Sequence, residues 1–307
     1  MYLLGVDGGG TKTEYVLAKA DCTVVDTLYT GTCSHEQFSD GFDGMERAMS
    51  AQLNELFSRN GITAADIAAA GFGLAGADLP WQVTELKKRV AALGFARFDV
   101  ANDGILGIKA ACENGVGLCA VNGTGTVIIG ANENGEILQV GGVGRLSGDN
   151  AGGNYIKDRI VAALYDFYYR CGADSVMFDE VLNLLGAKAD NLLAVVYDWE
   201  LLHNNMKDLI KVGAESAANN DAVAKKIFDK AGESIGKSAA GCIRRLGFSA
   251  ACVDIVQVGS IWHRIPYTGM SEIFLQTVNE LSGKDCRIAK SEVSAAMGGV
   301  YWAKQLL

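Results

Sequence analysis

The stretch 5–14, which reads GVDGGGTKTE, carries the residue types best suited to bind a phosphate. Three consecutive glycines let the backbone turn tightly and present N–H groups to an anion, because no Cβ intervenes. The threonines and Lys12 add donors, and Asp7 could hold a hydrated Mg²⁺. The candidate ligands in this loop are Asp7, Gly8, Gly9, Gly10, Thr11 and Lys12.

Two apolar runs, 2–4 and 15–18, flank this loop and predict a β-hairpin. A Walker loop needs Gly-Lys-Ser/Thr at the start of a helix, whereas Gly10 is followed here by Thr11 and then Lys12. A Rossmann loop also opens a helix, which the β-like run after Glu14 argues against. A tight turn without any ligand remains the alternative at this point.

The same pattern returns about 115 residues later in the chain. A strand-like run at 118–121 leads into NGTGT at 122–126, and further β-like runs follow at 127–129 and 137–138. Two such units predict duplicated domains that each present a Gly/Thr hairpin to a shared cleft. Gly123, Thr124 and Gly125 are then a second candidate phosphate cradle, and chance resemblance between two hairpins is the alternative.

A carboxylate follows another short strand, 98–100, in the sequence Asn102-Asp103-Gly104. Open α/β sheets place reactive groups at strand ends, so Asp103 could take the proton from a substrate hydroxyl. An aspartate that only caps a turn is the alternative interpretation.

Two further segments have the composition of ligand-contacting loops. The segment 141–153, GGVGRLSGDNAGG, is dense in glycine, and its Asp149 could accept hydroxyl hydrogen bonds. A merely flexible loop is the alternative there. Gly259 and Ser260 end an apolar strand where a small residue could admit a flat base.

Two motif matches are set aside. The segment 71–76 satisfies G-x-G-x-x-G, but no helix opens directly behind it. The segment 232–236 satisfies G-x-S-x-G, yet it lies inside a long helical period and not at a strand-to-helix turn.

The elements that must position these residues alternate along the chain. Strands are expected at 2–4, 15–18, 23–25, 67–72, 98–100, 118–121, 127–129, 137–138 and 252–258. Helices are expected at 42–58, 81–93, 155–169, 179–185, 190–197, 199–218, 222–246, 271–281 and 294–306. This alternation predicts an α/β fold in two lobes, with a hinge near residue 118.

Composition narrows the class of protein. The 307 residues include 49% hydrophobic ones, which is enough for a well-buried protein of two domains. The net charge of −9 argues against a nucleic-acid partner, and no apolar stretch approaches the roughly 20 residues that span a bilayer. Eight scattered cysteines and three distant histidines predict reduced thiols and no His-based metal cage. No signal-peptide pattern opens the chain, so we expect a cytoplasmic protein.

These motifs, in this order, resemble those of the acetate and sugar kinase/Hsc70/actin superfamily. Within it, the chain is similar to the N-acetylglucosamine kinase branch related to the BadF/BadG/BcrA/BcrD ATPases. The segments 5–13 and 123–125 resemble the two phosphate motifs, and Asn102-Asp103 falls at the catalytic aspartate. The segment 141–149 resembles the sugar loop, and 294–300 the closing helix that returns to the N-terminal lobe.

The resemblance implies a set of ligand contacts. On the nucleotide side it implies Ala217, Gly259 and Ser260, in addition to the two phosphate loops, with Asp7 toward the metal. On the sugar side it implies Ser34, Gly76, Asp78, Asn102, Asp103, Gly142, Val143, Gly144 and Asp149. Three departures lie on that side: Ser34 replaces an asparagine, Ala77 a glycine and Asn150 a glutamate.

The resemblance therefore implies a two-lobed actin-like ATPase fold, with ribonuclease H-like duplicated domains and the active site in the cleft between them. The lobes are expected at 1–117 with 291–307, and at 118–290. The implied activity is ATP- and Mg²⁺-dependent phosphorylation of an amino sugar, with N-acetylglucosamine and its 6-hydroxyl as first choice. A homodimer is also expected. The alternatives are an ATPase that activates a reductase and a non-catalytic sugar or nucleotide sensor.

Overall fold

Two five-stranded sheets form the frame of the molecule. The computed structural model describes all 307 residues, except for the side chain of Glu113. The first sheet has the order β3-β2-β1-β4-β5. Its strands are β1 (Tyr2–Gly8), β2 (Lys12–Lys19), β3 (Val24–Gly31), β4 (Ile67–Leu74) and β5 (Phe98–Ala101). The three strands β1, β2 and β3 pair antiparallel, whereas β4 and β5 extend the sheet in parallel with β1.

The second sheet repeats this topology. Its order is β10-β9-β6-β7-β8, in which β6, β7 and β8 pair antiparallel and β9 and β10 run parallel to β6. The strands are β6 (Gly117–Asn122), β7 (Thr126–Ala131), β8 (Ile137–Gly141), β9 (Cys252–Val258) and β10 (Asp285–Ala289). The duplication predicted from the two hairpins is confirmed, and with it the two-lobed α/β fold. The sequence analysis missed β10.

Side chains that alternate along β1 bury both faces of the first sheet. Leu4 and Val6 pack toward α1 (Phe42–Asn60) and α2 (Pro80–Ala92), whereas Leu3 packs in a separate cluster with Val300. The guanidinium of Arg89 on α2 joins the two helices through ion pairs of 2.6 and 2.7 Å with Asp43 and Glu46 on α1. Period-2 alternation thus makes β1 a central strand covered on both sides.

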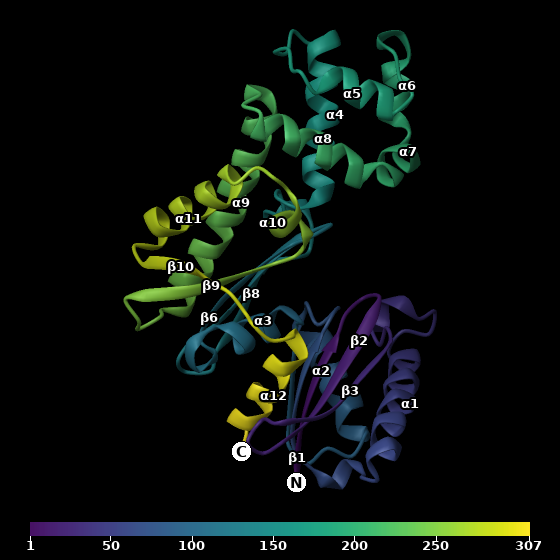
Figure 1. Cartoon of the computed structure of the whole chain (residues 1–307), viewed down its shortest axis with the longest axis vertical. Helices are drawn as coiled ribbons and strands as arrows, with labels where there is room; N and C mark the ends of the chain where they lie inside the picture. The colour runs from purple at the N-terminus through teal and green to yellow at the C-terminus, as the bar shows by residue number, and fades with distance from the viewer.

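The C-terminal helix α12 (Ala295–Gln305) covers the second face of the first sheet. The two ends of the chain consequently lie close together at the foot of the N-terminal lobe (Figure 1). Three glycines, Gly5, Gly71 and Gly299, allow this contact. A Cβ on Gly5 would lie 2.0 Å from the Ala296 carbonyl oxygen, and one on Gly71 would lie 2.5 Å from that of Gly299.

A short helix after β5, α3 (Gly104–Ala111), packs against both α12 and the second sheet. The sequence analysis missed this helix. The apolar cluster around it draws on both sheets and on α12; its buried members are Ala101, Ile105, Leu106, Ile108, Cys112, Cys119, Ile129, Ala131, Val256 and Trp302. The helix α3 therefore contributes much of the apolar contact between the lobes.

The remaining helices belong to the C-terminal lobe and form its outer part (Figure 1). They are α4 (Gly153–Tyr169), α5 (Phe178–Leu184), α6 (Leu192–Tyr197), α7 (Trp199–Asn204), α8 (Met206–Ala218), α9 (Ala222–Leu246), α10 (Ser260–Arg264) and α11 (Gly269–Ser282). The single helix expected over 199–218 is wrong, because Asn205 leaves helical geometry and caps α8 as a separate element. The segment 232–236 lies within α9, as expected.

All eight cysteines are free thiols, and five of them are buried. Over the residues that the structure describes, no helix is long and apolar enough to cross a membrane. Within the same set, no group of three His, Cys, Asp or Glu side chains could hold a metal ion by itself.

Candidate active site

The candidate residues of the N-terminal lobe lie where its strands end. The strands β1, β4 and β5 run parallel, so their carboxyl ends share one edge of the sheet. The glycine loop follows β1, Gly76 and Asp78 follow β4, and Asn102 and Asp103 follow β5. The backbone N–H of Ala75 donates to the Gly8 carbonyl at 2.8 Å, which fixes the end of β4 against the glycine loop.

Asp103 stands at the N-cap of α3, but its side chain makes no capping hydrogen bond. Asn102 serves instead, because its Oδ1 accepts from the Gly104 N–H at 2.9 Å. The side chain of Asp103 therefore does not cap α3 itself, and its role as a base stays a prediction. Burial, and next the negative charge of Asp78, raise the pKa of Asp103 to about 6.

The carboxylate of Asp7 lies in the electrostatic field of Asp103. Burial, and next the charges of Asp103 and Glu14, raise the pKa of Asp7 to about 7, while Lys12 acts in the opposite direction. Two partly buried carboxylates near each other at the end of a sheet repel when both are ionised. A bound cation or a shared proton would reduce this repulsion. The structure thus brings together the two acids that the sequence placed 96 residues apart in separate motifs.

Both glycine loops leave open space where side chains would otherwise stand. A Cβ on Gly10, Gly123 or Gly125 would have no neighbouring heavy atom within 4 Å. Among the described residues, the N–H groups of Gly10 and Thr124 have no acceptor in the protein. An open cradle with unpaired donors is suited to the oxygens of a phosphate chain.

The second loop is held from two directions. The N–H groups of Gly153 and Asn154, at the start of α4, donate to the carbonyls of Gly123 and Thr124 at 2.8 and 3.0 Å. At the end of β9, a Cβ on Gly259 would lie 2.3 Å from the Asn122 carbonyl oxygen. Gly259, with a φ of 109°, thus allows the strand end to approach the loop, and Ser260 begins α10 beside it.

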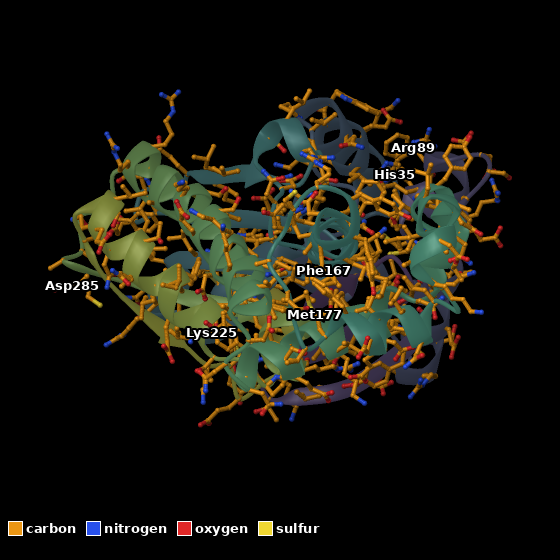
Figure 2. All side chains as sticks on the ribbon, turned by 90° about the horizontal axis from the view of Figure 1, so that it is seen from above. His35, Arg89, Phe167, Met177, Lys225 and Asp285 are labelled. Atoms are coloured by element: carbon orange, nitrogen blue, oxygen red, sulfur yellow. The ribbon has the colours of Figure 1, made fainter. Side chains whose placement is uncertain are left out.

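The rim of the first lobe joins Ser34, Gly76 and His35. The Ser34 hydroxyl donates to the Ala75 carbonyl at 3.4 Å, and a Cβ on Gly76 would lie 2.6 Å from Cε1 of His35. The His35 ring stacks on Phe42 with 4.1 Å between ring centroids. His35 is only 8% exposed and lies on the same side of the molecule as Arg89, away from Asp285 (Figure 2).

The glycine-rich segment 141–153 is organised by its own aspartate. The N–H groups of Gly142 and Gly144 donate to the two oxygens of Asp149, at 2.8 Å to Oδ1 and through a shorter contact to Oδ2. Both glycines have positive φ, so the turn requires them. Asp149 therefore shapes the loop, while Val143 is 60% exposed at its tip. The alternative interpretation of 141–153 as a merely flexible loop is therefore wrong, because Asp149 holds the segment by hydrogen bonds.

Ala217 is buried in the last turn of α8 and is only 1% exposed. Its expected contact with a nucleotide therefore stays a prediction.

The structure also adds two residues that the sequence analysis did not select. Gln139 on β8 reaches Asp78, and Asn122 is fully buried with neither side-chain polar atom hydrogen-bonded among the described residues. Only their positions at the ends of predicted strands could have pointed to them.

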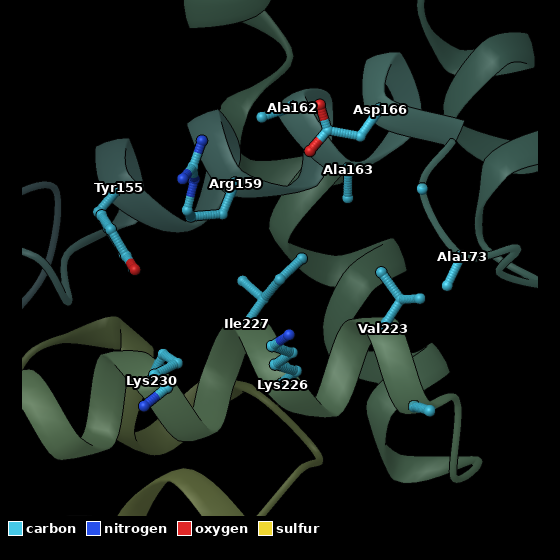
Figure 3. A pocket seen from close by; sticks show the side chains of 12 residues that line it. Tyr155, Arg159, Ala162, Ala163, Asp166, Ala173, Val223, Lys226, Ile227 and Lys230 are labelled. Atoms are coloured by element: carbon cyan, nitrogen blue, oxygen red, sulfur yellow. The ribbon is translucent and has the colours of Figure 1, made fainter. Parts of the chain in front are cut away.

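A separate cavity of about 550 Å³ lies in the C-terminal lobe, between α4 and α9. Tyr155 and Arg159 line it from α4, and Lys226, Ile227 and Lys230 line it from α9 (Figure 3). It includes none of the candidate residues, so the candidate site is the open space at the two sheet edges and not this groove.

Comparison with known proteins finds one family that matches nearly the whole chain. Residues 4–303 match the model of the BadF/BadG/BcrA/BcrD ATPase family. The chain is 23% identical over 305 residues to the N-acetylmuramic acid/N-acetylglucosamine kinase of Clostridium acetobutylicum, covering 99% of this chain and 98% of that protein.

Solved structures show the same fold at low sequence identity. A candidate N-acetylglucosamine kinase from Chromobacterium violaceum superposes with a TM-score of 0.65, at 23% identity and 97% coverage of both chains. A ROK family glucokinase from Streptomyces griseus, solved with glucose and AMPPNP, gives a TM-score of 0.52 at 16% identity, covering 100% of this chain and 99% of that one. With the family model matching nearly its whole length, the chain belongs to the BadF/BadG/BcrA/BcrD ATPase family.

Proposed function

We propose that this protein is an ATP-dependent kinase of an amino sugar, with Asp103 as the general base. The observation that carries the proposal is the Asp103 carboxylate, whose side chain makes no capping bond and whose pKa is raised to about 6. Such a base is largely ionised at neutral pH, yet it is more basic than an ordinary aspartate. It stands at the edge of the sheet that carries the first of two open glycine loops.

In this mechanism, Asp103 accepts the proton of a sugar hydroxyl as the oxygen attacks the terminal phosphorus of ATP. The bond from that phosphorus to the bridging oxygen breaks at the same time, and ADP leaves with the electron pair. The loops Gly8–Lys12 and 123–126 hold the phosphates from the two lobes through backbone N–H groups, and the Lys12 ammonium adds positive charge. Gly259, Ser260 and Ala217 would border the nucleotide. Positioning and charge stabilisation then provide most of the rate enhancement.

The mutual repulsion of Asp7 and Asp103 fits a divalent cation between ATP and this lobe. Asp7 is the residue that would hold Mg²⁺, through water and together with phosphate oxygens, because one carboxylate alone is too few ligands. When bound, the ion would neutralise charge on the phosphates and on Asp7.

N-acetylglucosamine is our first choice of acceptor, and its 6-hydroxyl the first choice of position. The names of the Clostridium acetobutylicum and Chromobacterium violaceum proteins support an amino-sugar acceptor. We assign acceptor contacts to Ser34, Gly76, Asp78 and Asn102 on one lobe. On the other lobe we assign them to Gly142, Val143 and Gly144, with Asp149 holding that loop.

The test is a coupled ADP-release assay with ATP and Mg²⁺ over glucose, glucosamine, N-acetylglucosamine, N-acetylmannosamine and N-acetylmuramic acid. We expect sugar-dependent ADP release that is fastest with an N-acetylated amino sugar, and a product heavier by one phosphate in mass spectrometry. ATP turnover that is indifferent to every sugar would contradict the proposal.

The lobe boundaries at 117/118 and 290/291, the homodimer and the cytoplasmic location are also proposals. The packing of α12 on the first sheet supports the return of 291–307 to the first lobe. Size-exclusion chromatography with light scattering tests the dimer, for which the expected mass is twice the 32.4 kDa of the chain.

A further inference from the structure

One aspartate joins the two lobes on the sugar side of the candidate site. The Oδ1 atom of Asp78 accepts from Nδ2 of Asn102 at 2.9 Å, within the first lobe. The same oxygen accepts from Nε2 of Gln139 at 3.1 Å. Gln139 belongs to β8 of the second sheet, so this hydrogen bond crosses from one lobe to the other.

The amide of Gln139 also fixes the start of the glycine-rich loop. Its Nε2 donates a second hydrogen bond to the Gly141 carbonyl at 3.2 Å, so both N–H groups of the amide are used. A Cβ on Gly142 would lie 2.9 Å from this nitrogen, which shows how closely the loop packs against it. The position of the loop is therefore tied to that of Asp78.

The other end of this connection reaches the residue beside the proposed base. Asn102 is only 8% exposed, and its Oδ1 accepts from the Gly104 N–H at 2.9 Å. The hydrogen bonds thus link Gly141, Gln139, Asp78, Asn102 and Gly104 in an unbroken series from the second lobe to the first turn of α3. Asp103 lies between two members of this series in the chain.

We propose that Gln139 is a positioning residue for the acceptor, because its hydrogen bond to Asp78 holds the two lobes together on the sugar side of the cleft. We call the group Asp78, Asn102 and Gln139 the latch. The inference rests on the proposed sugar kinase function and adds a residue to it. Among the described residues, Oδ2 of Asp78 has no hydrogen-bond partner, so it stays available to an acceptor hydroxyl while Oδ1 holds the latch.

The latch makes a specific prediction about which kinetic constant changes. If the lobes are not already held together, the substrate must bind a less populated closed form, and its apparent affinity is lower. Loss of a hydrogen bond to a charged acceptor should therefore raise the KM for the sugar about 10-fold to 100-fold. The kcat at saturating sugar should change by less than about threefold, since Asp103 and the phosphate loops are untouched.

The experiment compares wild type, Gln139→Ala, Gln139→Glu and the double variant Asp78→Asn/Gln139→Glu. Sugar KM and kcat are measured at saturating ATP and Mg²⁺. The carboxylate introduced by Gln139→Glu would repel Asp78, so this variant should show the larger KM increase. In small-angle X-ray scattering without ligands, it should also show a larger radius of gyration than wild type.

The double variant tests whether the two side chains act through each other. The amide that Asp78→Asn introduces can donate a hydrogen bond to the carboxylate that Gln139→Glu introduces. It does so at the expense of the hydrogen bond from Asn102, because Oδ1 of Asp78 accepts from both residues in the wild type. Asp78→Asn should therefore partly restore KM in the Gln139→Glu background. Measured by itself as the reference, it should instead raise KM, because Asp78 also contacts the acceptor.

Two controls separate the latch from other effects. Gln276→Ala removes a similar amide-to-carboxylate bond, 2.8 Å to Glu280, on the exposed side of α11 and should change neither KM nor the radius of gyration. Gln82→Ala removes the acceptor for the N–H groups of Asp78 and Leu79 and loosens the Asp78 loop within one lobe. It should leave the radius of gyration unchanged.

The outcomes are distinct. Unchanged KM and radius of gyration in both single variants of Gln139 overturn the latch. A raised KM with an unchanged radius of gyration and no rescue also overturns it, and assigns Gln139 a direct contact with sugar. If the wild type phosphorylates no sugar, the proposed function fails, while the scattering comparison still decides whether Gln139 holds the lobes together.

Discussion

At the scale of single residues, the candidate site is controlled by three aspartates at the ends of neighbouring strands. Asp7, Asp78 and Asp103 share one edge of the first sheet, and Asp103 raises the pKa of Asp7 while Asp78 raises that of Asp103. Each carboxylate has a different environment: hydrogen bonds hold Asp78, whereas burial dominates at Asp7 and Asp103. These environments suit them to different roles.

Asp103→Asn should abolish most activity without unfolding the protein. The amide has the same shape but cannot accept the hydroxyl proton, so kcat should fall by about 10²–10⁴-fold. The side chain makes no capping bond, so the thermal midpoint should stay within a few degrees of wild type. Full sugar-dependent ADP release from a folded Asp103→Asn variant would remove Asp103 from the role of base.

Asp78→Asn should move the pH dependence of the reaction. The base must be deprotonated, so kcat/KM of the wild type should rise with pH and level off above a pKa of about 6. Removing the negative charge of Asp78 stabilises ionised Asp103 and so lowers the pKa of Asp103. The rise of kcat/KM with pH should therefore occur at lower pH in the variant. Asp21→Asn, in an exposed turn, is the control. An unchanged pH dependence of kcat/KM in Asp78→Asn would show that the charge of Asp78 does not raise the pKa of Asp103.

Asp7→Asn should stabilise the folded protein at alkaline pH while it weakens Mg²⁺-dependent activity. The pKa of Asp7 is raised by folding from 3.8 to about 7, so the stability associated with the protonated acid is lost as pH rises toward and through 7. An asparagine avoids this loss. We expect a thermal midpoint several degrees higher than wild type at pH 8, with little difference at pH 4. Equal midpoints at pH 8 would contradict the burial of this charge.

At the scale of elements, two helices hold the sheets together. α12 covers the first sheet, where glycines of the strands lie directly against the helix backbone. α3 packs between α12 and the second sheet. The glycine loops depend on this arrangement, because the strands that carry them can present a defined edge only if both sheet faces are buried.

Gly5→Ala tests the close approach of α12. Its new methyl group would lie 2.0 Å from the Ala296 carbonyl oxygen, and a helix backbone cannot move aside without disturbing the whole contact. We expect a loss of about 1–3 kcal/mol in the free energy of unfolding, measured by urea denaturation. Gly31→Ala is the matched control on β3, because its Cβ would meet no atom within 4 Å. Equal stability of the two variants would contradict the packing.

At the scale of the whole molecule, the lobes cannot be separated by cutting the chain once. Residues 1–117 contain the first sheet, but one face of that sheet is covered by α12 from the other end of the chain (Figure 1). Lobe motion must therefore bend two connections, one after α3 and one before α12. The hydrogen bond from Gln139 to Asp78, which we propose as part of a latch, joins the lobes at a point away from these covalent connections in sequence.

A fragment of residues 1–117 should not fold by itself. It would expose Leu3, Val16, Ala18 and Ala69, which are buried against α12 in the intact chain. We expect aggregation or a circular dichroism spectrum without cooperative melting. Joining residues 291–307 to the fragment through a flexible linker should restore cooperative unfolding. A fragment 1–117 that melts cooperatively would refute the proposed return of 291–307 to this lobe.

Much of this architecture could be predicted from the printed residues. Glycines and threonines between apolar runs predicted both hairpins, and their repetition predicted the duplicated fold that the two sheets confirm. The helix α9 and the strand β9 begin and end at the predicted residues, because long apolar periods are strong local signals. Short or atypical segments failed: α3 and β10 were missed, and a single asparagine divided the helix expected over 199–218.

The sequence alone determined the chemical inventory of the site, since glycine, threonine and aspartate have the same donors, acceptors and backbone freedom wherever they stand. The tertiary structure decided which of them act together. It placed Asp7 in the field of Asp103, turned Asp149 inward to hold its own loop, and brought Gln139 to Asp78 from the other sheet. Contacts between residues far apart in sequence depend on how two sheets pack, which no local pattern encodes.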